Sequence, residues 1–213
     1  MMCALSPASD PGAEAVPGGN VYPKYTTRNP IARRLVAGFL SALQELVRQS
    51  GAREIHEVGC GEGYLTTLLA KQGCRIRGSD LSPAAIAEAR RRAAALGLDI
   101  PFAIADIYDL ERGRDSAELV LCCEVLEHLP DPQRALERLH EITARHLIVS
   151  VPREPLWRLL NLARGRYWPA LGNTPGHLQH WSRSAFLEFL KRRFEVIATR
   201  TPLPWTMALC RKR

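Results

Sequence analysis

A glycine-rich stretch in the first third of the chain carries residues that could bind a ligand through the backbone. Residues 57–63 read Glu-Val-Gly-Cys-Gly-Glu-Gly, and Asp80 follows after a helix-length segment. Glycine lacks a Cβ, so the backbone of such a turn can approach a ligand closely. A carboxylate at the tip of the next strand can accept hydrogen bonds from both hydroxyls of a ribose. The pattern therefore predicts a nucleotide-binding turn.

Carboxylates and imidazoles gather in a second segment. Residues 124–128 read Glu-Val-Leu-Glu-His, and a helical turn would place Glu124, Glu127 and His128 on one face. These groups could ligate a divalent cation, with His177 of a later loop as a fourth ligand. A bound cation would stabilise the deprotonated form of an acceptor hydroxyl. Two alternatives stay open: His128 or His177 acts as a metal-free general base, or the side chains only pack and cap.

Alternating strands and helices must position these residues. Strands are expected at 55–58, 74–79, 101–105, 117–123 and 146–151, and helices at 64–72, 84–96 and 133–144. A helix starting at Asn29-Pro30 precedes them, and one starting at Ser182 or Ser184 follows. This alternation predicts an α/β fold with a mostly parallel sheet and helices on both faces. Two consecutive final strands, 194–201 and 206–210, predict an antiparallel end.

Length and composition fit one domain. The chain has 213 residues, of which 46% are hydrophobic, and shows no break in composition after the first twenty. We expect a disordered leader at 1–20 and a single domain at 21–213, with an insertion at 152–181. No run of apolar residues is long enough to span a membrane. Six cysteines without a C-x-x-C pair favour a reducing cytoplasm.

The formal net charge is +7 and draws on three basic clusters, at 90–92, 191–193 and 211–213. Such charge can attract nucleic acid, anionic lipid or a phosphorylated substrate. Alternatively, the basic clusters are only solvated helix faces and a charged C-terminus, without a binding role. Because no basic motif interleaved with aromatic residues is present, binding to nucleic acid is disfavoured.

The glycines at 59, 61 and 63 are spaced G-x-G-x-G, which differs from the dinucleotide fingerprint G-x-G-x-x-G. With an acid before the first glycine, this spacing resembles the Rossmann-like, class I S-adenosylmethionine-dependent methyltransferases. The resemblance implies a seven-stranded sheet in the order 3-2-1-4-5-7-6. It covers 55–153 with good motif order and the remaining C-terminal part more weakly.

The resemblance also implies which residues hold the cofactor. The candidate residues are Glu57, Gly59, Gly61, Gly63, Asp80, Leu81, Asp106, Ile107 and Cys123. The glycines would accommodate methionine and ribose, and Asp80 would hold the ribose hydroxyls. Asp106 and Ile107 would read adenine, with Leu81 lining its pocket. Glu57 would order the glycine loop or help to bind the amino acid end of the cofactor. For both Asp80 and Asp106 the alternative role is capping a local turn.

The E-x-x-E-H segment and a later H-x-x-x-W resemble ubiquinone-pathway O-methyltransferases and, more distantly, small-RNA terminal 2′-O-methyltransferases. Those relatives imply a metal (Mg, Mn or Zn) at Glu124, Glu127, His128 and His177. We expect methyl transfer to a small-molecule acceptor at oxygen. The apolar and arginine-rich insertion would cover an aromatic, lipid-like or anionic acceptor, or form only an amphipathic covering helix. Alternatives are an RNA methyltransferase and a non-catalytic cofactor-binding partner protein.

Overall fold

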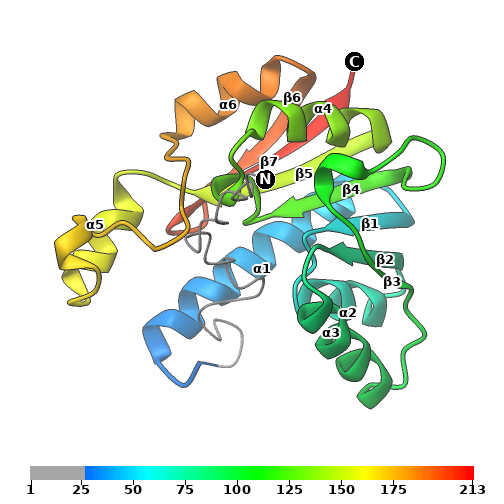
Figure 1. The fold of residues 1–213 in the computed structure, drawn as a ribbon, viewed down its shortest axis with the longest axis horizontal. Helices are drawn as coiled ribbons and strands as arrows, with labels where there is room; N and C mark the ends of the chain where they lie inside the picture. The colour runs from blue at the N-terminus through cyan, green and yellow to red at the C-terminus, as the bar shows by residue number, and fades with distance from the viewer. Residues whose placement is uncertain (1–26) are drawn as a thin grey trace, which may run out of the picture.

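A seven-stranded sheet forms the centre of the computed structural model, which describes residues 27–213 (Figure 1). The predicted leader, 1–20, lies outside the described residues. The strands are β1 (Glu54–Val58), β2 (Arg75–Asp80), β3 (Phe102–Ile104), β4 (Ala117–Cys123), β5 (Thr143–Pro152), β6 (Phe194–Arg200) and β7 (Trp205–Lys212). The α-helices are α1 (Pro30–Ser50), α2 (Tyr64–Lys71), α3 (Pro83–Ala95), α4 (Pro132–Ile142), α5 (Leu156–Ala163) and α6 (Arg183–Lys191). The predicted alternation of strands and helices is confirmed.

The strand order is β3-β2-β1-β4-β5-β7-β6, as the family resemblance implies. Neighbouring strands from β3 to β5 pair in parallel, whereas β7 is antiparallel to both β5 and β6. In parallel α/β sheets, ligands bind beyond the carboxyl ends of the strands where the order reverses. Here that position lies between β1 and β4, so the loops after these two strands border the site.

Alternate side chains of β4 pack on opposite faces of the sheet. Val120 and Cys122 join a core with α4 and α6, whereas Leu119 and Leu121 join a core with α1 and α2. Helix α3 packs at the β3 edge, where Ala89 belongs to a smaller cluster. Since β4 is covered on both faces, it reads as a continuous apolar run. The prediction of helices on both faces is confirmed (Figure 1).

The polar caps expected at three helix starts are present. Asn29 accepts hydrogen bonds from the backbone N–H of Ile31 at 2.9 Å, and Ser82 accepts one from Ala85 at 3.2 Å. Of the two candidates before α6, Ser182 is the cap, since its hydroxyl accepts from the N–H of Ala185 at 3.2 Å. These bonds satisfy N–H groups that have no partner within the helix.

Two differences from the sequence-based expectation stand out, besides shifts of one or two residues at the ends of several strands. Helix α4 ends at Ile142, and β5 begins at Thr143 rather than at His146. The Thr143 hydroxyl donates to the carbonyl of Leu139 at 2.6 Å, which closes the helix where its backbone turns extended. The second difference concerns 124–128, where only Leu126–His128 form a short 3₁₀ turn, η2, instead of an α-helical turn.

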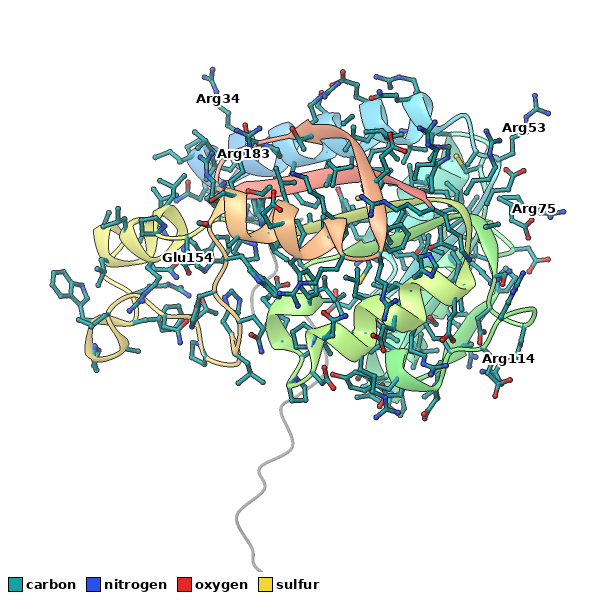
Figure 2. The ribbon with its side chains drawn as sticks, turned by 90° about the horizontal axis from the view of Figure 1, so that it is seen from above. Arg34, Arg53, Arg75, Arg114, Glu154 and Arg183 are labelled. Atoms are coloured by element: carbon teal, nitrogen blue, oxygen red, sulfur yellow. The ribbon has the colours of Figure 1, made fainter. Side chains whose placement is uncertain are left out.

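The chain between β5 and α6 contains α5 and the 3₁₀ turn η3 (Trp168–Ala170). It corresponds to the expected insertion, 152–181, and stands out from the layered body in both views (Figures 1 and 2). Among the helices of residues 27–213, none combines the length and the apolar character needed to cross a membrane.

Candidate functional site

The glycine loop after β1 is held against β2 and leaves no room for a side chain at its first glycine. The N–H groups of Gly59 and Cys60 donate to the carbonyl of Ser79 at 2.8 and 2.9 Å. Gly59 has φ 74°, and a Cβ built on it would lie 2.3 Å from Cγ2 of Val125. Val125 follows β4, so glycine at this position brings the loops after β1 and β4 together. Both the positive φ and the contact with Val125 therefore require glycine at position 59.

Asp80, at the end of β2, binds the glycine loop directly. One carboxylate oxygen accepts from the N–H of Gly61 at 2.8 Å, and the other accepts from the N–H of Ser82 at 2.9 Å. The carboxylate thus lies between the loop and the start of α3, at the sheet edge where the sequence predicts a ribose contact. Through the bond to Ser82, Asp80 also caps the local turn before α3.

Gly63 is the N-cap of α2 with φ 71°, and its lack of a side chain allows α2 and α3 to pack closely. A Cβ at this position would lie 2.9 Å from Cβ of Ala89 on α3. Close packing here brings the N-terminus of α2 to the sheet edge. A helix N-terminus presents unpaired N–H groups and favours an anionic ligand group such as a carboxylate.

Glu57 is buried and ties β1 to α2 beneath the loop. Its carboxylate accepts a hydrogen bond from the Thr66 hydroxyl. This geometry supports the expected role of Glu57 in ordering the loop. Thr66 was not singled out from the sequence, because a threonine within a helix carries no motif of its own.

His56 provides a second buried polar connection below the loop. Nδ1 lies 2.8 Å from the carbonyl of Asp115 and Nε2 lies 2.8 Å from the Ser79 hydroxyl. A carbonyl only accepts, so Nδ1 carries the proton and Nε2 accepts from Ser79. Burial lowers the pKa of His56 from its usual value to about 4. The imidazole is therefore neutral at physiological pH and serves the structure rather than the chemistry.

The remaining cofactor candidates lie along the same edge of the sheet. Leu81 is 65% exposed directly after Asp80, which is unusual for a large apolar side chain and fits a surface on which a ligand ring packs. Asp106 accepts from the N–H of Tyr108 at 2.9 Å and caps the 3₁₀ turn η1 (Ile107–Asp109). Ile107 is buried within the core, and Cys123 is buried at the end of β4.

Three of the four predicted metal ligands come together after β4. The candidate ligand atoms of Glu127, His128 and His177 all lie within 4.8 Å of one another. Glu127 and His177 are buried, whereas His128 is exposed. The two imidazole rings meet edge to face with centroids 4.9 Å apart. The structure thus brings a residue of the distant insertion to the turn after β4, as the sequence analysis expects.

Glu124 is not part of this group, which corrects the predicted shared face. It adopts φ 61°, so the backbone reverses before η2 instead of running helically through it. Its carboxylate accepts hydrogen bonds from the Ser150 hydroxyl, at 3.0 Å, and from the indole N–H of Trp205. Ser150 belongs to β5 and Trp205 to β7, and the group of mutually close ligand atoms does not include Glu124.

Backbone hydrogen bonds clamp the His177 loop onto the turn η2. The N–H groups of Leu178 and Gln179 donate to the carbonyl of Glu127 at 2.8 and 3.0 Å. In the other direction, Nδ1 of His128 lies 2.9 Å from the carbonyl of Gly176. Because that carbonyl only accepts, a neutral His128 carries its proton on Nδ1 and keeps the lone pair on Nε2.

Trp157 of α5 supports the same loop from the side. Its indole stacks on His177, and its N–H donates to the Thr174 hydroxyl at 2.9 Å. Asn161, buried in the insertion, donates to the same hydroxyl at 3.1 Å. The sequence pattern predicts for Trp157 only a place in a cover over the acceptor. Its contact with His177 depends on how the chain after α5 folds back onto that helix, and no local sequence motif predicts this contact.

Trp181, the tryptophan of the H-x-x-x-W pattern, has a structural role. It packs against Phe186 and Phe189 of α6, with ring centroids 5.8 and 5.5 Å apart. Beside it, a cavity of about 740 Å³ separates the start of α5 from the start of α6. Arg153, Glu154, Pro155, Leu156, Ser182, Arg183, Ser184, Leu187, Glu188 and Lys191 line that cavity. None of these residues belongs to the Glu127, His128 and His177 group.

Comparisons with known proteins agree with this arrangement. Residues 55–146 match a family model described as a methyltransferase domain. A ubiquinone biosynthesis O-methyltransferase of Coxiella burnetii (strain Dugway 5J108-111) is 31% identical over 121 residues, which are 57% of this chain and 48% of that protein. The protein of the same name from Alkalilimnicola ehrlichii is 29% identical over 75% of this chain and 67% of its own length. The chain spans about half the length of the first of these relatives.

Solved structures show the same fold. The N-methyltransferase NodS from Bradyrhizobium japonicum WM9, in complex with S-adenosyl-L-homocysteine, has a TM-score of 0.67 and 22% identity over 92% of this chain and 94% of its own. Magnesium protoporphyrin IX methyltransferase from Synechocystis PCC 6803, with bound S-adenosyl-L-homocysteine, has a TM-score of 0.67 and 19% identity over 88% and 89%. Residues 55–146 are thus similar to a methyltransferase domain, and the chain shares the fold of these solved methyltransferases.

Proposed function

We propose that this chain transfers the methyl group of S-adenosylmethionine to an oxygen of a small-molecule acceptor. The observation that carries the proposal is the convergence, at one edge of the sheet, of the glycine loop and the Glu127, His128 and His177 group. The similarity to ubiquinone biosynthesis O-methyltransferases supports oxygen as the attacking atom. Bound S-adenosylmethionine would supply an electrophilic methyl group on a sulfonium.

The residues along this edge fit that cofactor. Gly59 lets the loops after β1 and β4 meet, and Asp80, which holds the N–H of Gly61, lies where ribose hydroxyls would meet its carboxylate. The exposed face of Leu81 would pack on adenine, with Asp106 and Ile107 on the next loop. Glu57 would act indirectly by holding the loop through Thr66. Cys123, at the end of β4, would border the methionine portion.

His128 is the residue we assign to the acceptor's proton. Its Nδ1 is committed to the carbonyl of Gly176, so Nε2 carries the lone pair. In the metal-free form of the proposal, Nε2 takes the proton from the acceptor hydroxyl as the oxygen attacks the methyl group. The new carbon–oxygen bond forms as the carbon–sulfur bond breaks, and S-adenosylhomocysteine leaves. His177, held by Trp157, would orient the acceptor or share this task.

The same group also fits a divalent cation. One carboxylate and two imidazoles suit Zn²⁺ or Mn²⁺ better than Mg²⁺, which prefers oxygen ligands. A histidine that ligates a metal commonly donates its other ring N–H to a backbone carbonyl, as His128 does to Gly176. Such an ion would lower the pKa of a bound acceptor hydroxyl. Since Glu124 is held by Ser150 and Trp205, the proposed set has three protein ligands.

The acceptor would enter between the glycine loop and the insertion. We propose an aromatic or lipid-like compound, because Trp157 and the apolar part of the insertion border the histidine group. The arginines of the insertion would favour an anionic substituent on that compound. A vicinal diol such as a catechol would place one oxygen for attack and a second for binding.

Incubation with labelled S-adenosylmethionine and a catechol panel tests the proposal. We expect formation of S-adenosylhomocysteine together with a methylated catechol, and we expect His128→Ala to abolish both. Methyl transfer only to RNA would instead establish the alternative of an RNA methyltransferase. Cofactor binding without turnover, in the presence or absence of Mn²⁺ and with whole-cell metabolite extract as acceptor, would favour the non-catalytic partner protein.

A further inference from the structure

The three consecutive arginines of α3 have three different partners. Arg90 donates to a backbone carbonyl of β3 at 2.7 Å. Arg91 extends along the surface of its own helix, where its Nε donates to the carboxylate of Glu88 at 2.9 Å. Arg92 instead reaches the glycine loop, and its Nε donates to the backbone carbonyl of Glu62 at 3.0 Å. One member of this basic cluster therefore contacts the loop that is expected to border the cofactor.

Arg92 makes two further contacts on the same side of the loop. One of its terminal nitrogens lies 3.9 Å from the carboxylate of Glu62, and its guanidinium carbon lies 5.6 Å from the centroid of the Tyr64 ring. A guanidinium over an aromatic face is attracted by the electrons of the ring. These contacts leave the Arg92 side chain 26% exposed, whereas that of Arg91 is 69% exposed. The Arg92 guanidinium is thus held by several groups and connects α3 to the end of the loop.

The contact with Arg92 complements the bonds from the loop to β2. The N–H groups of residues 59–61 donate to the carbonyl of Ser79 and to the carboxylate of Asp80. These bonds hold the first half of the loop through its N–H groups. Arg92 holds the second half through a carbonyl, that of Glu62, from the side of α3. The two halves of the loop are therefore fixed by different elements of the fold.

A loop that contains three glycines has many accessible conformations unless other groups hold it. Gly59, Gly61 and Gly63 all have positive φ, between 53° and 74°. Glycine adopts positive and negative φ about equally well, so the peptide groups beside it rotate at little cost. Glu62 lies between two of these glycines, and a hydrogen bond to its carbonyl restricts rotation of the peptide group that leads into Gly63. Arg92 therefore reduces the number of conformations open to the second half of the loop.

We propose that Arg92 is a positioning residue of the cofactor site. It holds the Glu62 carbonyl, so that the second half of the glycine loop has its binding conformation before the cofactor arrives. A preorganised site loses less conformational entropy when the ligand binds. The inference rests on the proposed function only for the identity of the cofactor. Because the loop is expected to border the methionine portion, Arg92 should matter most for ligands that carry this portion.

Hydrogen exchange in the free protein tests the effect of Arg92 on the loop. The amide of Gly63 donates to the carbonyl of Cys60 at 3.0 Å, and in Arg92→Gln it should exchange about tenfold faster, because local opening becomes easier. Arg92→Lys keeps the charge and a donor, so it should restore part of the protection. Arg91→Gln is the matched control and should exchange like the wild-type protein, since Arg91 pairs with a carboxylate of its own helix.

Two ligands distinguish a positioning role from a general loss of stability. S-adenosylhomocysteine carries the amino acid portion, whereas methylthioadenosine contains adenine and ribose without it. We expect Arg92→Gln to raise the Kd for S-adenosylhomocysteine about tenfold and the Kd for methylthioadenosine less than about twofold, with an unchanged circular dichroism spectrum. Equal weakening of both ligands, no change in either, unchanged exchange of Gly63, or the same losses in Arg91→Gln would overturn the proposal.

These measurements need no turnover, so they separate the role of Arg92 from the proposed reaction. Wild-type protein that binds S-adenosylhomocysteine but transfers no methyl group would contradict the proposed reaction and not the role of Arg92. Wild-type protein that binds neither ligand would overturn both.

Discussion

The indole of Trp157 lies against the imidazole of His177, with ring centroids 5.8 Å apart and planes inclined by 28°. Trp157 also approaches Trp205, whose indole N–H binds the Glu124 carboxylate. A residue of the insertion thus supports one histidine of the candidate site and contacts the group that holds Glu124. The position of His177 depends on α5, although α5 carries none of the proposed chemistry.

Replacement of Trp157 by leucine should impair the chemical step more than cofactor binding. Loss of the flat indole lets the His177 ring move, and small misplacements of reacting groups cost about tenfold to a hundredfold in rate. We expect kcat to fall by that amount, while the Kd for S-adenosylhomocysteine changes less than about twofold. Trp168→Leu, at the exposed indole of the same segment, is the control assayed with a soluble catechol. Equal losses in kcat and cofactor affinity would indicate a merely structural role for Trp157.

Alanine at Gly59 should be much more damaging than alanine at Gly51. Both glycines have positive φ, but a Cβ on Gly51 meets nothing within 4 Å, whereas a Cβ on Gly59 would meet Val125 at 2.3 Å. Backbone strain alone costs about 1 kcal/mol, and overpacking adds about 1–3 kcal/mol. Denaturant unfolding of the two variants measures the difference. Equal free energies of unfolding would show that the loop accommodates a side chain at Gly59.

Replacement of one proposed metal ligand should abolish metal binding and leave cofactor binding unchanged. We expect titration of Mn²⁺ into the wild-type protein to give a measurable heat, and His128→Ala or Glu127→Gln to lose it, because each removes a ligand atom. Affinity for S-adenosylhomocysteine should stay within about twofold. Glu111→Gln, on an exposed loop, is the matched carboxylate control. Full turnover in the presence of chelator would exclude the metal and leave His128 as the general base.

Acid should destabilise the fold through His56. Burial lowers the pKa of His56 to about 4, whereas the unfolded chain takes up its proton near pH 6.5. The unfolded state therefore binds more protons between these values, and the free energy of unfolding falls as pH drops from about 6.5 to 4, by roughly 3 kcal/mol in total. His56→Gln should flatten this part of the pH profile. An unchanged slope in that variant would show that other groups cause the acid sensitivity.

Local sequence patterns were sufficient to predict the glycine loop after β1 and the position of Asp80 at the end of β2. Gly59, Gly61 and Asp80 are close in the chain, and a strand, a turn and a helix of this length fold back in only one way. The strand order also matched what the family resemblance implied. The individual elements could be predicted because apolar runs such as β4 and helix caps such as Asn29 and Ser82 are local sequence features.

The arrangement of the proposed acceptor side could not be predicted in full, because it depends on contacts between segments that are distant in the sequence. Glu124 was expected beside Glu127, but Ser150 and Trp205 hold it elsewhere, and neither partner is near it in sequence. Nothing local in the pattern indicates the positive φ of Glu124. His177 was expected near His128 from the family resemblance, whereas the support from Trp157 emerges only from the folded insertion.

Calorimetric titration of S-adenosylmethionine into the folded chain tests the central claim most directly. We expect saturable binding with a Kd on the order of 1–100 μM, and at least about tenfold weaker binding by Asp80→Asn, which loses the charge that would face the ribose in the proposed site. Asp99→Asn, at an exposed aspartate beyond α3, should bind like the wild-type protein. The absence of any uptake by folded protein at millimolar cofactor would contradict the proposed site at the carboxyl edge of the sheet.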